Sequence, residues 1–153
     1  MNSSDAVVGP SEEQHEEVYG ATFSRYTAAE LEEFVTPFEQ LLLANGIDPT
    51  SLFGGRRVLD AGCGGGRGAL LALRSGAEHV EAFDVSESNI ATTHRVLRQE
   101  FENFSVRLGT LADLPYEDRS FDVVWCNGVL MHTANPGATL PELIRVLKPA
   151  GAA

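Results

Sequence analysis

The segment 56–68 is the feature that most constrains the fold of this chain. It reads RRVLDAGCGGGRG, in which a short apolar run and Asp60 precede five glycines among residues 62–68. An apolar run of this length is typical of a buried strand, and the glycines allow a tight turn and a close approach of the backbone to a ligand. The pattern predicts a strand over 57–60, a ligand-binding loop, and a helix over 66–75.

Strand and helix patterns alternate along the rest of the chain. Apolar runs such as VVWC are continuous rather than alternating, which is typical of parallel strands that are buried on both faces. The expected fold class is α/β, a Rossmann-like doubly wound parallel sheet. The predicted strands are 57–60, 80–84, 104–108 and 121–126, and the predicted helices that accompany them are 66–75, 87–102 and 136–147.

The residues before this alternating region divide into two parts. Residues 1–26 form an acidic segment that we expect to be partly disordered, with a short acidic helix over 12–19. A capping box at Thr27–Glu30 predicts the start of a helix, and Pro37 predicts a kink or two abutting helices. The predicted domain is therefore 27–153, with a helical lead-in before the first strand.

Composition excludes some classes of function. The net charge is −11, but residues 1–33 hold eight acids and one base, so the acidity belongs mainly to the N-terminal part. No basic stripe is present, which disfavours nucleic-acid partners. The sequence shows no apolar run near membrane-spanning length and no secretory signal, and its two cysteines have no metal-site spacing. We expect a cytoplasmic protein that does not enter a membrane and needs no metal.

A second acid completes the candidate ligand site. Asp84 ends the second predicted strand, where a carboxylate accepts hydrogen bonds from ribose hydroxyls while the first glycine loop lies beneath the rest of the ligand. Dehydrogenases and methyltransferases share this pairing, so it predicts an adenosine-type ligand without deciding the reaction. The glycines of this chain follow DxGxGxG, with Gly62 and Gly64 in the first positions, rather than the GxGxxG of dinucleotide folds.

Four stretches in order along 57–151 resemble the motifs of class I S-adenosylmethionine-dependent methyltransferases, of the methyltransferase type 11-like group. They are VLDAGCGGG, the motif after the third strand and the motif of the fourth strand, both within LPYEDRSFDVVWCNGVLMH at 114–132, and RVLKPAG at 145–151. A dehydrogenase would explain the glycines and Asp84 but not the stretch at 114–132. The resemblance implies S-adenosyl-L-methionine as cofactor.

The resemblance also implies a role for particular residues. Asp60, Gly62 and Gly64 would face the methionine part of the cofactor, and Asp84 would bind its ribose. The adenine would lie by Thr110 and Leu111, the sulfonium near Asn127, and His132 is a candidate general base. At Thr110 the sequence departs from relatives, which often carry an acid there. Asp60 and Asn127 have structural alternatives as a cap for loop amides and as a support for the loop after the fourth strand. Asp84 has the alternative of an acid at a helix N-terminus, and His132 has that of a structural residue of its loop.

The family's sheet has seven strands, and the resemblance implies that this sequence stops where the fifth begins, at 151–153. We therefore expect four strands and an exposed edge on the strand 121–126, through which the chain would self-associate. The predicted function is methyl transfer to a small-molecule acceptor, because the sulfonium supplies the electrophile and the protein mainly aligns the acceptor. The alternative is a non-catalytic module that binds the cofactor or a partner protein.

Overall fold

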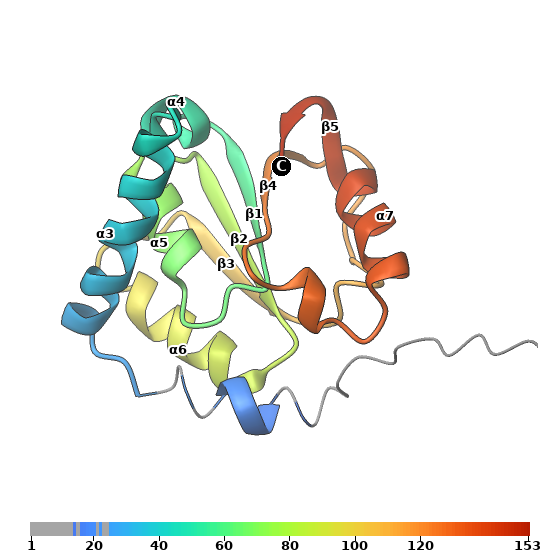
Figure 1. Cartoon of the computed structure of the whole chain (residues 1–153), viewed down its shortest axis with the longest axis horizontal. Coiled ribbons are helices and arrows are strands. Elements are labelled where there is room, and N and C mark those ends of the chain that lie inside the picture. The colour runs from blue at the N-terminus through green and yellow to red at the C-terminus, as the bar shows by residue number, and fades with distance from the viewer. Residues whose placement is uncertain (1–13, 15, 21, 23–24) are drawn as a thin grey trace, which may run out of the picture.

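The computed structural model describes residue 14, residues 16–20, residue 22 and residues 25–153. A five-stranded sheet in the order β3-β2-β1-β4-β5 forms its centre, and every neighbouring pair of strands is parallel (Figure 1). This is the predicted Rossmann-like α/β fold. The strands are β1 (Arg57–Ala61), β2 (His79–Asp84), β3 (Phe104–Leu108), β4 (Phe121–Trp125) and β5 (Leu147–Ala152).

Helices cover both faces of the sheet, as continuous apolar strands require. One apolar cluster joins the sheet to α3 (Ala28–Ala44), α4 (Pro49–Phe53), α5 (Arg67–Arg74) and α6 (Glu87–Leu97). A second cluster packs Leu143 and Val146 of α7 (Pro136–Val146) against the other face (Figure 1). β1 lies at the middle of this sandwich, and its Val58 and Leu59 are completely buried.

The N-terminal predictions have mixed outcomes. The capping box is confirmed, since the Thr27 hydroxyl accepts from the Glu30 amide while the Glu30 carboxylate accepts from the Thr27 amide. The alternative of two abutting helices at Pro37 is wrong, because α3 is a single helix through this residue. Pro37 lies on the exposed side, and burial of Leu31 and Val35 holds the helix in place.

The segment 12–19 was predicted to be a short acidic helix. Its residues 12, 13 and 15 lie outside the described part of the chain, as does the predicted disorder of residues 1–11. What the structure describes there is η1 (Glu16–Gly20), a π-helical turn that packs against α6.

The predicted count of four strands, with a bare edge on the strand at 121–126, is wrong. β5 pairs in parallel with β4, so β4 is an interior strand and β5 forms this edge of the sheet. The sequence of β5, LKPAGA, does not predict a strand, because it lacks β-branched residues and contains Pro149. Proline has no amide to donate, so strands tolerate it at edges and irregularities, and the register of β4 and β5 does shift between its two paired positions.

Arg145 on α7 fastens the connection between β3 and β4. Its guanidinium donates to the carbonyl oxygens of Leu114 and Tyr116 at 2.9 and 2.8 Å, and to the carboxylates of Glu142 and Asp118. The guanidinium of Arg145 therefore binds both the loop before β4 and an acid of its own helix, and these contacts fix the loop.

Replacing Arg145 with Gln is expected to lower the free energy of unfolding by about 1–2 kcal/mol, because a single amide cannot satisfy the two loop carbonyls and the two carboxylates. Arg98→Gln is the matched control, since Arg98 is exposed and its guanidinium has no hydrogen bond or ion pair among the described residues. Urea unfolding measures both variants. Equal midpoints for the two would show that the Arg145 contacts contribute nothing to stability.

Candidate functional site

The glycine loop after β1 is fixed by the ends of two other elements. The amides of Gly62 and Cys63 both donate to the carbonyl of Phe83, at 2.8 and 3.0 Å, so the loop lies across the end of β2. Gly62 has a φ of +81°, and a Cβ there would lie 2.5 Å from a methyl group of Val129. Only glycine combines this backbone conformation with this close approach.

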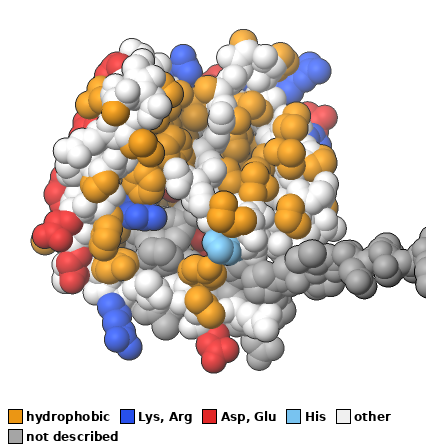
Figure 2. Space-filling model, in the orientation of Figure 1, with side chains coloured by type: hydrophobic (Ala, Val, Ile, Leu, Met, Phe, Trp, Pro, Cys, Tyr) orange, Lys and Arg blue, Asp and Glu red, His pale blue; other side chains and the backbone are white. Residues whose placement is uncertain are grey.

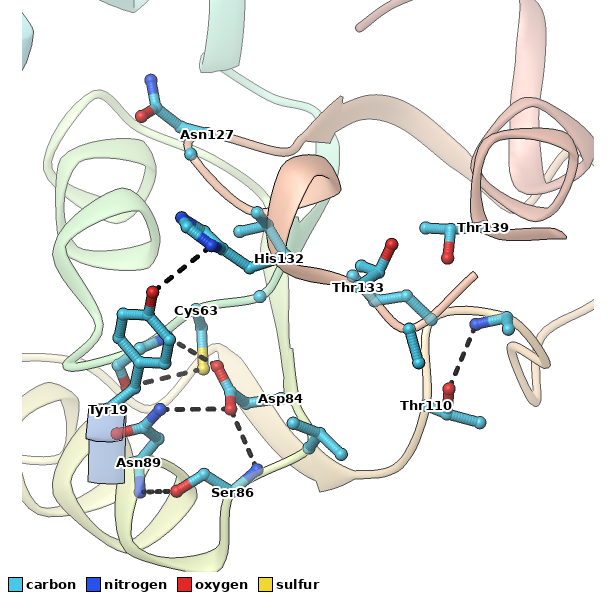
Figure 3. Close-up of a pocket in the computed structure, with 18 of the residues that line it drawn as sticks. Tyr19, Cys63, Asp84, Ser86, Asn89, Thr110, Asn127, His132, Thr133 and Thr139 are labelled. Carbon is cyan, nitrogen blue, oxygen red and sulfur yellow. Dashed lines mark hydrogen bonds between the residues drawn. The ribbon is translucent and has the colours of Figure 1, made fainter. Parts of the chain in front are cut away.

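Asp84, at the end of β2, joins the loop to α6 (Figure 3). One carboxylate oxygen accepts from the Gly64 amide at 2.9 Å. The other accepts from the Ser86 amide at 2.9 Å and from the side-chain amide of Asn89 at 3.1 Å. The carboxylate is 8% exposed, so these donors compensate most of the cost of burying its charge.

A cavity of about 290 Å³ opens where these elements meet. It lies at the carboxyl ends of β1, β2 and β4, next to the point where the strand order reverses, which is where open α/β sheets bind ligands. Seven of the eight residues singled out from the sequence line it: Gly62, Gly64, Asp84, Thr110, Leu111, Asn127 and His132.

Asp60 is the exception, because it does not line this cavity. Its carboxylate is 3% exposed and accepts from the Ala69 amide at 2.7 Å, so it caps the first turn of α5 from below the loop. Burial is the main cause that raises the pKa of Asp60 to about 7, and the nearby charge of Asp84 adds to it. This contact is the one expected of a cap for loop amides, and a role of Asp60 toward the methionine part of the cofactor stays a prediction.

The remaining predicted residues occupy the other walls. Leu111 is buried, and the Thr110 hydroxyl accepts from the Ala112 amide at 3.3 Å, so it bends the loop after β3. His132 lies in η2 (Leu130–His132), and its Nδ1 is 3.3 Å from the hydroxyl of Tyr19 (Figure 3). Tyr19 comes from η1, so a segment far away in the sequence closes one side of the cavity.

Sequence reasoning missed several lining residues. Tyr19 stands in a segment without periodicity, and no pattern links it to residues more than 100 positions away. Asn89 had a usable signal, since it follows Asp84 within the first turns of a predicted helix. Its Oδ1 is buried and has no hydrogen-bond partner among the described residues, although its side-chain amide donates to Asp84. A buried acceptor of this kind at a cavity wall is suited to a ligand hydroxyl.

The two thiols lack the character of nucleophiles. Both cysteines are free, and burial is the main cause that raises the pKa of Cys63, with Asp84 and Asp60 adding to it. Burial likewise raises the pKa of Cys126 to about 11. Both therefore remain protonated at neutral pH and serve as small packing groups.

Residues 59–153 match the family described as the methyltransferase domain. The chain belongs to this family. Curated relatives include a ubiquinone biosynthesis O-methyltransferase of Neisseria meningitidis, which is 37% identical over 101 residues covering 63% of this chain and 42% of that protein. A glycine/sarcosine/dimethylglycine N-methyltransferase of Actinopolyspora halophila is 34% identical over 97 residues, covering 62% of this chain and 17% of that protein. The chain thus spans less than half the length of these relatives.

Solved structures agree on the fold. The [4+2]-cyclase SpnF superposes with a TM-score of 0.71 at 24% identity, covering 93% of this chain and 58% of that one, which shows a shared fold alone. An arsenic(III) S-adenosylmethionine methyltransferase of Chlamydomonas reinhardtii has a TM-score of 0.61 at 29% identity, covering 65% of this chain and 38% of that one.

The cavity residues fit S-adenosylmethionine, the cofactor that membership of this family implies. Asp84 and the Oδ1 of Asn89, which has no partner among the described residues, are acceptors suited to the two ribose hydroxyls. Glycines of the loop also line the cavity, where they leave room for a ligand. Leu111 adds a buried apolar side chain to the cavity lining, which suits an aromatic base. Within the described residues, no helix is long and apolar enough to cross a membrane, and no three His, Cys, Asp or Glu side chains cluster as metal ligands.

The raised pKa of Asp60 predicts an unusual dependence of stability on pH. Its carboxyl ionises near pH 4 in the unfolded chain and near pH 7 when folded, so the folded state holds the extra proton between these values. Stability from this group is therefore complete below pH 4 and is lost as the pH rises toward 7. Relative to Asp60→Asn, the native protein should lose about 1 kcal/mol of unfolding free energy per pH unit from pH 5 to 7.

Urea unfolding of both proteins at several pH values measures this difference. Asp113→Asn is the control, because Asp113 is exposed and should leave the slope of the native protein unchanged. If native and Asp60→Asn curves run parallel across this pH range, Asp60 is ionised in the folded protein and the prediction is wrong.

Proposed function

We propose that this chain forms the S-adenosylmethionine-binding part of an enzyme that transfers a methyl group to a small-molecule acceptor. The observation that carries the proposal is the contact between the glycine loop and Asp84, at 2.9 Å from the Gly64 amide, on the wall of one cavity. A loop that approaches a ligand closely and an acid that accepts from ribose are thereby brought to one adenosine-sized site.

Methyl transfer from S-adenosylmethionine needs few catalytic groups from the protein. S-adenosylmethionine carries the reactive methyl group and its leaving group when it is bound. The residues of this chain would hold the nucleoside, exclude water and align the acceptor. Asn127 follows β4 and lines the cavity, so we assign it to the region of the sulfonium.

We assign His132 as the general base for acceptors that lose a proton on methylation. It lines the cavity, and its Nδ1 contacts the Tyr19 hydroxyl, which leaves Nε2 as the nitrogen that meets an acceptor. Relatives named for O-methylation and for N-methylation both match this chain, so an oxygen and a nitrogen acceptor are both consistent with this assignment.

The test is binding of S-adenosylhomocysteine to the native chain and to Asp84→Asn by isothermal titration calorimetry. The substitution replaces one of the two acceptor oxygens by an NH2 group, which is a donor, so it meets one of the donors around Asp84 and removes one acceptor from the site. We expect the affinity to fall by about tenfold or more, the usual loss for a hydrogen bond to a charged group. Asp113→Asn, an exposed acid on the loop after β3, is the matched control and should bind normally.

Two comparisons discriminate the alternatives. NAD titrated into the same protein should show no binding, and binding of NAD in place of S-adenosylhomocysteine would favour a dehydrogenase. A methyl-transfer assay with a panel of phenols and small amines then separates turnover from binding alone. Unchanged affinity of Asp84→Asn for S-adenosylhomocysteine would sink the assignment of this cavity.

A further inference from the structure

Arg67 has a distinctive position on the cavity wall. It is the first residue of α5 and directly follows the glycine loop. Among the described residues that line the cavity, it is the single Lys or Arg, just as Asp84 is the single acid. The cavity therefore carries one fixed negative group and one fixed positive group.

Two aromatic rings of α3 hold the guanidinium from behind. Its central carbon lies 4.7 Å from the ring centroid of Phe38 and 5.8 Å from that of Phe34. A guanidinium over an aromatic face is stabilised by the ring electrons, and its N–H donors at the edge stay available. The side chain is thus positioned by packing rather than by an acidic partner.

No hydrogen bond or ion pair within the described residues engages the Arg67 donors. The other arginine of α5, Arg74, shows the contrast, since it pairs with Glu32 and Glu100. Arg67 is half-buried, and burial is the main cause that lowers its pKa, opposed by Tyr26 and Asp60. A partly desolvated guanidinium without an acceptor favours an anion that replaces the lost water.

We propose that Arg67, backed by Phe34 and Phe38, is a carboxylate-binding subsite of this cavity. The planar guanidinium can donate two parallel hydrogen bonds to a carboxylate. Asp84, the single acid among the described lining residues, is already held by three other donors, so the carboxylate that Arg67 binds would come from a ligand. Two ligands bring a carboxylate to this place: the amino-acid end of the cofactor, or an acceptor that carries an acid group. Both sources rest on the proposed function, whereas binding of a carboxylate by Arg67 does not need it.

The first arm of the test compares S-adenosylhomocysteine with 5′-methylthioadenosine, which shares the thioether nucleoside but has no amino-acid end. Both are titrated into the native chain, Arg67→Gln and Arg67→Lys. If the cofactor supplies the carboxylate, Arg67→Gln should weaken S-adenosylhomocysteine by about 10- to 100-fold and leave 5′-methylthioadenosine unchanged. Arg67→Lys should recover part of the loss, because it keeps the charge but not the fork.

The second arm titrates benzoate and its neutral counterpart benzamide into the same proteins, with and without 5′-methylthioadenosine. If an acceptor supplies the carboxylate, Arg67→Gln should weaken benzoate selectively and leave S-adenosylhomocysteine unchanged. Arg74→Gln, on the same helix but outside the cavity lining, is the matched control and should bind every probe normally. Circular dichroism and thermal midpoints confirm that the variants are folded.

The proposal is overturned if no carboxylate probe depends on Arg67, or if S-adenosylhomocysteine and 5′-methylthioadenosine weaken equally, since Arg67 then only supports the loop. Failure of the proposed function looks different: neither nucleoside binds the native chain. The benzoate arm without nucleoside still reports on Arg67 in that case.

Discussion

The site depends on the hydrogen bonds that the carboxylate of Asp84 accepts. This carboxylate receives the Gly64 amide from the loop after β1 and, through Ser86 and Asn89, the first turn of α6. Three segments that each end at the same edge of the sheet are thereby held around one buried charge. These hydrogen bonds determine the geometry of the cavity, because the glycine loop can approach a ligand closely only when its amides are held in place.

The fold was largely predictable, and the exception has a physical reason. Strands such as β1 and β4 are buried on both faces, so their apolar runs carry the signal directly. β5 lies at the edge of the sheet and is partly exposed, and its pairing needs neither apolar residues nor every amide. A strand with Pro149 at its centre is therefore invisible to pattern reasoning, and the edge assigned to β4 was wrong for the same reason.

The site was predictable where ligand-facing residues follow strand ends, as Gly62, Asp84 and Asn127 do. Asp60 also lies near the end of a strand, yet its carboxylate accepts from the amide of Ala69, a contact that its sequence position does not reveal. Arg67 lies within the most informative motif of the chain, but the carboxylate-binding role proposed for it depends on the two aromatic rings of α3. Contacts of this kind between distant segments leave no periodic trace in a single sequence.

Most residues that line the cavity, Asp84 and Leu111 among them, belong to residues 59–153, which match the methyltransferase-domain family. Tyr19, which lines the cavity and contacts His132, comes from before this match. The rings that pack behind Arg67 also come from before it. On the face in Figure 2, a histidine lies near the centre, between hydrophobic groups from both sides. η1 and α3 therefore add contacts to η2 and α5 from outside the residues that match the family model.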